Sequence, residues 1–155
     1  MSNGHVVYVG TFTRDRGVGI HIYDLVDNYL VERSVVTVHN PTDLNINRKK
    51  KVLYSIADEG VVAFRILKDG NLSKINELWT GGMRGSYLTT DKSGRFLFSA
   101  GHYEGTVTVI KLNEDGSLGE VVETIYHKGL NIGVAKRGAE PHVISLKFTP
   151  DERFI

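Results

Sequence analysis

A pattern of about 45 residues repeats along the chain and limits its fold more than any other feature. Residues 51–72 (KVLYSIADEGVVAFRILKDGNL) resemble residues 95–118 (RFLFSAGHYEGTVTVIKLNEDGSL). The copies end in Asp-Gly turns that begin at Asp69 and Asp115, 46 residues apart. A weaker copy ends near Asp27, 42 residues before Asp69, and a fourth begins within residues 146–155. The chain is therefore built from successive copies of one supersecondary unit.

Six segments of the chain have the composition and alternation of β-strands. They are short, rich in β-branched and aromatic residues, and bounded by Gly, Asp or Asn, which is the pattern of strands joined by tight turns. No segment combines an apolar stripe of helical period with helix caps. We therefore expect an all-β fold with strands at residues 5–12, 19–25, 51–57, 60–66, 95–101 and 106–112.

The length of the repeat indicates how the strands are arranged. Units of 40–50 residues that each hold several strands are typical of β-propeller blades. We expect one domain over residues 1–155, with four-stranded blades near 5–36, 40–80 and 84–126 and the start of the next blade at 141–155. Because propellers close with about four to eight blades, we interpret the chain as the N-terminal portion of a longer propeller. A ring completed by a second chain and an open structure are the alternatives. Open strand edges in such a portion favour self-association.

Composition narrows the classes of function. Lys and Arg number 19 and Asp and Glu number 18, a net charge of +1, which argues against a broad basic field for nucleic acid. The chain has no cysteine, which excludes disulfides, thiolate metal sites and a cysteine nucleophile. No apolar run approaches the ~18 residues of a membrane span, and no signal peptide is visible. We expect a cytoplasmic protein that binds neither nucleic acid nor membrane.

Four stretches carry a resemblance to a known family. Residues 40–66 (NPTDLNINRKKKVLYSIADEGVVAFRI), 81–101 (GGMRGSYLTTDKSGRFLFSAG), 104–120 (EGTVTVIKLNEDGSLGE) and 139–155 (AEPHVISLKFTPDERFI) are similar to the lactonase family of seven-bladed propellers. The resemblance implies a 6-phosphogluconolactonase-like hydrolase of carbohydrate metabolism, which opens a sugar-phosphate lactone in the pentose phosphate pathway. It implies neither a metal ion nor another cofactor, and it places the site at one mouth of the central channel.

His142 is the first candidate for a catalytic group. It stands in GAEPHVIS, just before an expected innermost strand, where the family pattern resembles Pro-His-x-His. Pro141 and His142 match this pattern, whereas Ile144 replaces the second histidine. A histidine that titrates near neutral pH can take a proton from water, so His142 is the expected base. Ile144 favours the alternative function, a non-catalytic propeller that serves as a ligand- or protein-binding platform.

Arg84 occupies the position of His142 in the preceding repeat. It lies in GGMRGSYL, before another expected innermost strand, and the glycines around it would let a ligand approach the backbone. Polar side chains at equivalent positions of two blades should point to the same channel mouth. We therefore expect Arg84 and His142 to contribute to one catalytic site.

An insertion before His142 adds further candidates. Leu53 and Leu97 are 44 residues apart, but Leu97 and Ile155 are 58 residues apart, and the extra length falls at residues 131–140. Such a loop can surround a bound substrate, and a pair of cations can bind a phosphate group. Glu140 completes the expected catalytic group. The expected substrate-binding residues are Lys136 and Arg137 in the insertion and His102 and Tyr103 at a hairpin tip.

Two other features have a structural interpretation. The lone tryptophan, Trp79, is expected to pack between blades. The four cations from Arg48 to Lys51 are expected to form a solvated turn, because no aromatic residues are interleaved with them as in a nucleic-acid site.

Overall fold

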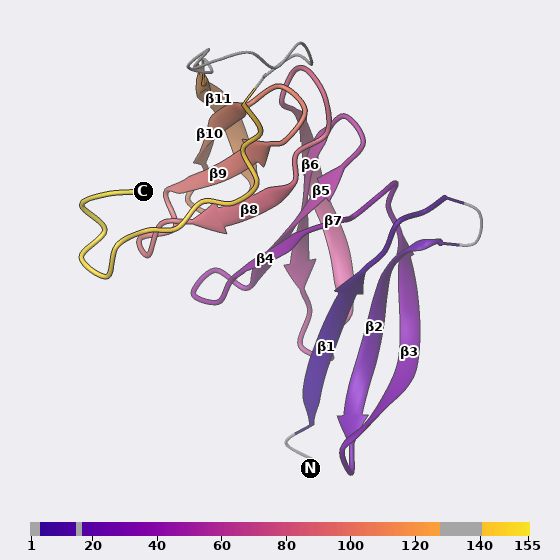
Figure 1. Cartoon of the computed structure of the whole chain (residues 1–155). Helices are drawn as coiled ribbons and strands as arrows, with labels where there is room; N and C mark the ends of the chain where they lie inside the picture. The colour runs from indigo at the N-terminus through magenta and orange to yellow at the C-terminus, as the bar shows by residue number, and fades with distance from the viewer. Residues whose placement is uncertain (1–3, 15–16, 128–140) are drawn as a thin grey trace.

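The computed structural model describes residues 4–14, 17–127 and 141–155, and these residues form three antiparallel β-sheets (Figure 1). β-Branched and aromatic residues alternate along the strands, and glycine or polar turn residues separate them, as the sequence predicts. The described residues form no helix. Their strands are β1 (His5–Gly10), β2 (Gly19–Val26), β3 (Tyr29–Thr37), β4 (Leu44–Asn47), β5 (Val52–Ala57), β6 (Gly60–Ile66), β7 (Leu72–Trp79), β8 (Tyr87–Thr90), β9 (Phe96–Gly101), β10 (Thr106–Leu112) and β11 (Leu118–Tyr126).

Strands that follow one another in the sequence are neighbours in each sheet. The first sheet has the order β1-β2-β3, the second β4-β5-β6-β7 and the third β8-β9-β10-β11. The inner strands of the second and third sheets are adjacent, because the carboxylate of Asp43 accepts a 2.6 Å hydrogen bond from the backbone N–H of Leu88. Successive antiparallel sheets packed side by side around their inner strands are consecutive blades of a β-propeller. The predicted fold class is confirmed.

The first sheet has three strands, whereas the repeat predicts four. Alignment of the repeats places Tyr8 in β1 at the position of Tyr54 in β5 and Phe98 in β9. β1 is therefore the counterpart of a second strand. Within the described ranges, no strand of the first sheet corresponds to the inner strands β4 and β8.

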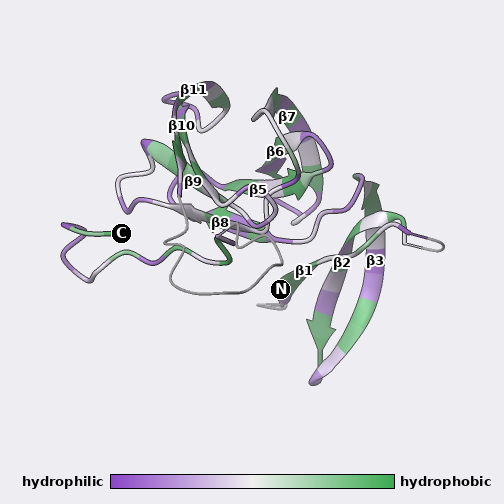
Figure 2. Cartoon of the chain, turned by 45° about the horizontal axis from the view of Figure 1, so that its top comes forward, coloured by the Kyte–Doolittle hydropathy of each residue, from purple (hydrophilic) through white to green (hydrophobic). Residues whose placement is uncertain are grey.

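Two hydrophobic clusters join the sheets. One lies between the first and second sheets and includes Ile20 and Leu53, and the other lies between the second and third sheets and includes Tyr54 and Leu97. Successive residues of a strand point to opposite faces of its sheet, so β5 sends Leu53 toward the first sheet and Tyr54 toward the third. Hydrophobic segments accordingly run along the strands, and the connecting loops are mostly polar (Figure 2).

The Asp-Gly turns of the repeat require a left-handed backbone. Gly70 and Gly116 have φ angles of 85° and 88°, which glycine adopts without steric cost. The aspartate before each glycine accepts a 2.9 Å hydrogen bond from the backbone N–H two residues later, which closes an Asx turn. The weaker copy in the first sheet is shorter, because Asp27 and Asn28, with φ angles of 48° and 68°, form a two-residue hairpin turn.

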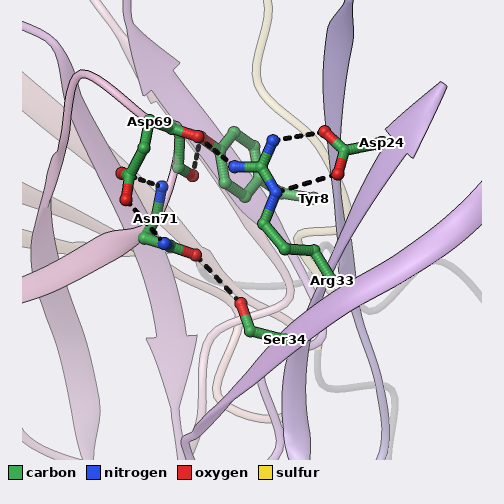
Figure 3. Close-up of polar contacts among 7 residues, drawn as sticks. Tyr8, Asp24, Arg33, Ser34, Asp69 and Asn71 are labelled. Carbon is green, nitrogen blue, oxygen red and sulfur yellow. Dashed lines mark hydrogen bonds and ion pairs between the residues drawn. The ribbon is translucent and has the colours of Figure 1, made fainter.

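The Asp-Gly turn of the second sheet is held by side chains of the first (Figure 3). The Tyr8 hydroxyl donates a 2.7 Å hydrogen bond to the carbonyl of Gly70. The guanidinium of Arg33 donates to the carbonyl of Asp69, while two further hydrogen bonds tie it to the carboxylate of Asp24. These hydrogen bonds hold the first and second sheets together on the side of the molecule where β1 begins.

No strand forms in residues 141–155, contrary to the expectation of an innermost strand there. The segment lies against the third sheet instead. The hydroxyl of Ser86 donates a 3.1 Å hydrogen bond to the carbonyl of Val143, and the ring of Phe148 packs edge-to-face on Phe98 at 5.2 Å. A strand needs a neighbour to satisfy its backbone groups, and no described strand is ladder-paired with this segment.

The two structural interpretations have opposite outcomes. Trp79 does not pack between blades, because 68% of its surface is exposed at the end of the outer strand β7. The run from Arg48 to Lys51 does form a turn, between β4 and β5. One of its cations is not free, since the ammonium group of Lys50 donates a 2.9 Å hydrogen bond to the carbonyl of Asn113 in the third sheet.

Candidate functional site

Strand register brings the segment of Arg84 and the hairpin of His102 and Tyr103 to the same end of the sheets. Leu44, which begins β4, pairs with Ser55 near the end of β5, and Tyr87, which begins β8, pairs with Ala100 near the end of β9. The segments that lead into the inner strands therefore lie beside the β5–β6 and β9–β10 hairpins. In Figure 1 these connections gather at the upper side of the second and third sheets.

Arg84 lies in the segment that leads into β8, and its side chain is only 17% exposed. Its guanidinium carbon sits 5.0 Å from the ring centre of Phe12, which comes from the loop after β1. Its Nη1 atom lies 3.6 Å from a carboxylate oxygen of Asp58 in the β5–β6 hairpin. That distance makes an ion pair rather than a hydrogen bond, so the guanidinium of Arg84 has no hydrogen-bond partner among the residues that the structure describes.

Asn40 connects these groups into a network. Its side-chain N–H donates a 2.6 Å hydrogen bond to the same oxygen of Asp58 that faces Arg84. Its side-chain oxygen accepts a 2.9 Å hydrogen bond from the backbone N–H of Thr13. Sequence reasoning did not identify Phe12, Asn40 or Asp58. Asn40 carries a detectable signal, because it stands 44 residues before Arg84, at the same position of the preceding repeat.

His142 is held with one ring nitrogen facing outward. Its Nδ1 atom lies 2.7 Å from the carbonyl oxygen of His102. Because a carbonyl only accepts hydrogen bonds, Nδ1 carries the proton in the neutral ring, and Nε2 keeps a free lone pair. The His142 ring stacks on the ring of His102 at a centroid distance of 4.4 Å, and Tyr103 packs edge-to-face on His102 at 5.2 Å.

Gly105 allows the segment of His142 to approach the β9–β10 hairpin. Gly105 has a φ of 62°, and a Cβ atom there would lie 2.3 Å from the carbonyl oxygen of Pro141. Any side chain at this position would therefore displace Pro141 and the neighbouring His142. This close approach places the imidazole directly over His102.

Two contacts join the surroundings of Arg84 to those of His142. The carboxylate of Glu104, in the β9–β10 hairpin, accepts a 3.1 Å hydrogen bond from the backbone N–H of Met83. The hydroxyl of Ser86 donates to the carbonyl of Val143 at 3.1 Å. The segment of Arg84 is therefore bonded both to the β9–β10 hairpin, on which His142 lies, and to the segment of His142 itself.

The expected Lys136, Arg137 and Glu140 lie outside the described residues. The structure instead adds a carboxyl group that sequence reasoning missed. Asp43 precedes β4, and burial raises the pKa of its carboxyl group, although hydrogen bonds from the backbone N–H groups of Leu88 and Leu44 oppose that rise. Through its hydrogen bond with Leu88, Asp43 joins the start of the inner strand of the second sheet to the inner strand of the third.

Asp58 also borders a cavity between the first and second sheets. The cavity has a volume of about 330 Å³, and its lining includes His39, Phe64 and Lys74. Among the residues that the structure describes, no group of three or more His, Cys, Asp or Glu side chains could hold a metal ion. Nor does any helix in these ranges have the length and apolar character needed to cross a membrane.

Comparison with known proteins decides the family. The model of the family described as "Lactonase, 7-bladed beta-propeller" matches residues 6–155. The chain belongs to this lactonase family. The resemblance of the four sequence stretches to seven-bladed lactonases is thereby confirmed.

Relatives of this lactonase chain include named enzymes. A 6-phosphogluconolactonase of Bacillus subtilis is 30% identical over 159 residues, which cover 97% of the chain and 45% of the relative. A solved Bacteroides fragilis protein is 27% identical with a TM-score of 0.85, over 96% of the chain and 43% of that protein. The periplasmic gluconolactonase of Pseudomonas aeruginosa is 25% identical with a TM-score of 0.82, over 96% of the chain and 45% of that protein. The lactonase chain thus spans less than half the length of these relatives.

Proposed function

We propose that this chain forms part of a lactone hydrolase that acts on a sugar-phosphate lactone, as a 6-phosphogluconolactonase does. The orientation of His142 is the observation that carries the proposal. Its Nδ1–H donates a hydrogen bond to the carbonyl of His102, so Nε2 is the nitrogen that can accept a proton, and the ring is exposed. The 6-phosphogluconolactonase of Bacillus subtilis and the gluconolactonase of Pseudomonas aeruginosa support the same reaction class.

The reaction needs one base and one cationic group near the lactone carbonyl. Nε2 of His142 would take a proton from water as the oxygen of that water attacks the carbonyl carbon. Arg84 would stabilise negative charge on the substrate through its free guanidinium N–H groups. The ring C–O bond then breaks, the imidazolium of His142 returns its proton to the ring oxygen, which becomes a hydroxyl group, and the new carboxylic acid releases its remaining proton to solvent to give the carboxylate product.

The remaining predicted residues complete the proposed site. Lys136 and Arg137 would bind the phosphate group, and Glu140 would act beside His142 as a second catalytic group. His102 and Tyr103 would form the wall against which the substrate rests, because His102 stacks on His142 and Tyr103 packs edge-to-face on His102. The proposal includes the pentose phosphate pathway and a cytoplasmic location, while one solved relative is named as periplasmic.

Substitution of His142 tests the proposed base. In His142→Asn, the amide nitrogen can still donate to the carbonyl of His102, but no proton acceptor replaces Nε2. We expect the catalysed hydrolysis of 6-phosphogluconolactone to fall by roughly 10²–10⁴-fold, the usual contribution of a general base. His5→Asn is the matched control, because His5 is exposed at the opposite end of β1. Equal activity of the His142→Asn variant and the control would refute the assignment.

Ile144 provides a second test, because it stands where the family pattern has its second histidine. Ile144 is 65% exposed and can be replaced without disturbing a core. If His142 is the base, Ile144→His should leave turnover within about threefold of the parent protein, since a surface substitution has little effect on structure. A gain of two orders of magnitude would instead place the base at position 144.

A further inference from the structure

The contacts around Arg84 form a closed circuit. Phe12 is followed by Thr13, whose backbone N–H donates a hydrogen bond to the side chain of Asn40. Asn40 donates to the carboxylate of Asp58, and this carboxylate forms an ion pair with Arg84. The guanidinium of Arg84 in turn lies against the ring of Phe12, which completes the circuit. One loop thus restrains Arg84 twice, once directly and once through two polar side chains. The circuit uses the first sheet's loop, the second sheet's hairpin and the segment that leads into the third sheet.

The two direct contacts restrain different motions of the guanidinium. The Phe12 ring lies against the Arg84 guanidinium at 5.0 Å, a cation–π distance that limits movement toward or away from the ring. The carboxylate of Asp58 faces Nη1, which selects one rotation of the side chain. No hydrogen bond from the Arg84 guanidinium to another described residue accompanies these contacts. An oriented guanidinium with free N–H groups is suited to bind a carboxylate or phosphate in its plane.

We propose that Phe12 and Asp58 are positioning residues that fix Arg84 as the anion-recognising group of the site. This inference rests on the proposed lactonase function and extends it, because it assigns the preference for an anionic lactone to a circuit shared by three sheets. Neither residue touches the reacting atoms in this arrangement. Their effect on the substrate passes through the orientation of Arg84.

Phe12→Leu and Asp58→Asn are the variants that test the circuit. Phe12→Leu removes the aromatic face but keeps an apolar side chain and leaves every charge in place. Asp58→Asn removes the charge that faces Arg84, while its amide oxygen can still accept the hydrogen bond from Asn40. Both positions are exposed by about half, at 57% and 49%, so the fold should tolerate both changes. Glu59→Gln is the control, because Glu59 is an exposed carboxylate in the same hairpin and neither hydrogen-bonds nor forms an ion pair with Arg84.

The first readout is the ¹⁵N NMR signal of the Arg84 Nε–H group, assigned with Arg84→Lys. In the parent chain we expect restricted rotation of the guanidinium and a resolved signal. Both circuit variants should broaden this signal or shift it to the position of a freely rotating arginine, and Glu59→Gln should leave it unchanged. An unchanged signal in both circuit variants would overturn the proposal, whatever the protein's activity.

The second readout is kinetic and compares phosphorylated gluconolactone with gluconolactone. We expect Phe12→Leu and Asp58→Asn to raise KM for the phosphorylated lactone by about three- to tenfold, as loss of a cation–π or charge contact predicts. KM for the neutral lactone should change less than twofold, and kcat should fall by a similar factor for both lactones, because Arg84 also stabilises negative charge near the lactone carbonyl. A lower KM in Asp58→Asn would show that Asp58 merely neutralises Arg84, and it would overturn the positioning role.

The two readouts separate this inference from the proposed function. If the parent protein turns over neither lactone, the hydrolase proposal fails, and calorimetry with 6-phosphogluconate replaces the kinetic readout. Weaker binding of this anion by both circuit variants, together with the altered NMR signal, would then still support the positioning role. Equal binding by the parent protein, both circuit variants and Glu59→Gln would overturn it.

Discussion

The interface between the first and second sheets and the interface between the second and third are built from the same repeat but differ in burial. In the first interface, the hydroxyl of Tyr8 donates to the carbonyl of Gly70 at 2.7 Å. In the second, the hydroxyl of Tyr54 donates to the carbonyl of Gly116 at 2.6 Å. Both pairs are 62 residues apart, so one sequence pattern produces the same bond twice.

An arginine accompanies the tyrosine at each interface. Arg33 donates to the carbonyl of Asp69, and Arg65 donates to the carbonyl of Asp115 at 2.9 Å. The two arginines come from different strands, β3 and β6, so they are not equivalent residues of the repeat. The carbonyl groups of the Asp-Gly turn therefore require a donor from the preceding sheet, and more than one position can supply it.

The second interface is the better buried of the two. Tyr54 is completely buried and Tyr8 is partly exposed. The hydrophobic cluster of the second interface has ten buried residues and that of the first has five. Among the described residues, only the second interface lies between two sheets that each have an inner strand. The repeat determines which groups bond at each interface, and because the hydrogen bond of Tyr54 is better buried than that of Tyr8, we expect it to contribute more to stability.

The largest expected effect comes from truncating the equivalent leucines of the two clusters. Leu97 and Leu53 are both fully buried and occupy the same position of successive repeats. We expect Leu97→Ala to lower the free energy of unfolding by about 4 kcal/mol and Leu53→Ala by about 3 kcal/mol, within the usual range for buried leucine. Urea unfolding of both variants measures the difference. A larger loss for Leu53→Ala would reverse the ranking of the interfaces.

Removal of the tyrosine hydroxyls should have the next largest effect. Tyr54→Phe leaves the carbonyl of Gly116 without its buried donor, which we expect to cost about 2 kcal/mol in unfolding free energy. Tyr8→Phe should cost about 1 kcal/mol, because water can replace the donor at the partly exposed site. Burial raises the pKa of both phenols, so the comparison is made with neutral side chains at pH 7. Equal losses would mean that burial does not distinguish the two bonds.

Acid pH should weaken the two Asp-Gly turns. The backbone N–H of Asn71 lowers the pKa of Asp69, and the hydroxyl of Ser117 lowers that of Asp115, each below the ordinary value of 3.8. A carboxyl group whose pKa is lower in the folded state contributes stability above pH 3.8, and that contribution is lost as the pH falls through the folded-state pKa.

The double variant Asp69→Asn/Asp115→Asn measures this contribution. We expect it to be less stable than the parent chain at pH 7, and the gap in melting temperature should narrow as the pH falls from about 4 toward 2. A gap that stayed constant over this range would show that the aspartate charges do not stabilise the turns.

The smallest expected effect concerns the third copy of the tyrosine position. Phe98 stands there, and its ring packs on Phe148 at 5.2 Å. No Asp-Gly turn of a following sheet faces it among the described residues. Phe98→Tyr should therefore change the unfolding free energy by no more than about 0.5 kcal/mol. A gain comparable to the loss in Tyr8→Phe would show that an acceptor is present in this position.

Local sequence patterns predicted the strands and the two Asp-Gly turns because alternation and glycine content act over a few neighbouring residues. Alignment of the repeats also placed Arg84 before the inner strand β8, whereas no strand follows His142 in residues 141–155. Phe12, Asn40 and Asp58 escaped prediction because they lie on three separate loops, and only the packing of the sheets brings them to Arg84. Their own sequence surroundings contain no chemical motif.

Two sequence predictions failed for reasons that concern neighbours. The expected strand in residues 141–155 has the right composition, but strand formation depends on a pairing partner as well as on propensity. Trp79 was expected between blades because a large aromatic side chain gains most from burial. It lies at the end of the outer strand β7, where 68% of its surface is left exposed.

The central claim is that one end of the sheets carries a lactone-binding site that includes Arg84 and His142. Titration of the ¹⁵N-labelled chain with 6-phosphogluconate, the product of the proposed reaction, tests this claim most directly. We expect the largest changes in backbone chemical shift at Arg84, His102 and His142. Changes confined to the Asp-Gly turns at the opposite end of the sheets, or no change at millimolar ligand, would contradict it.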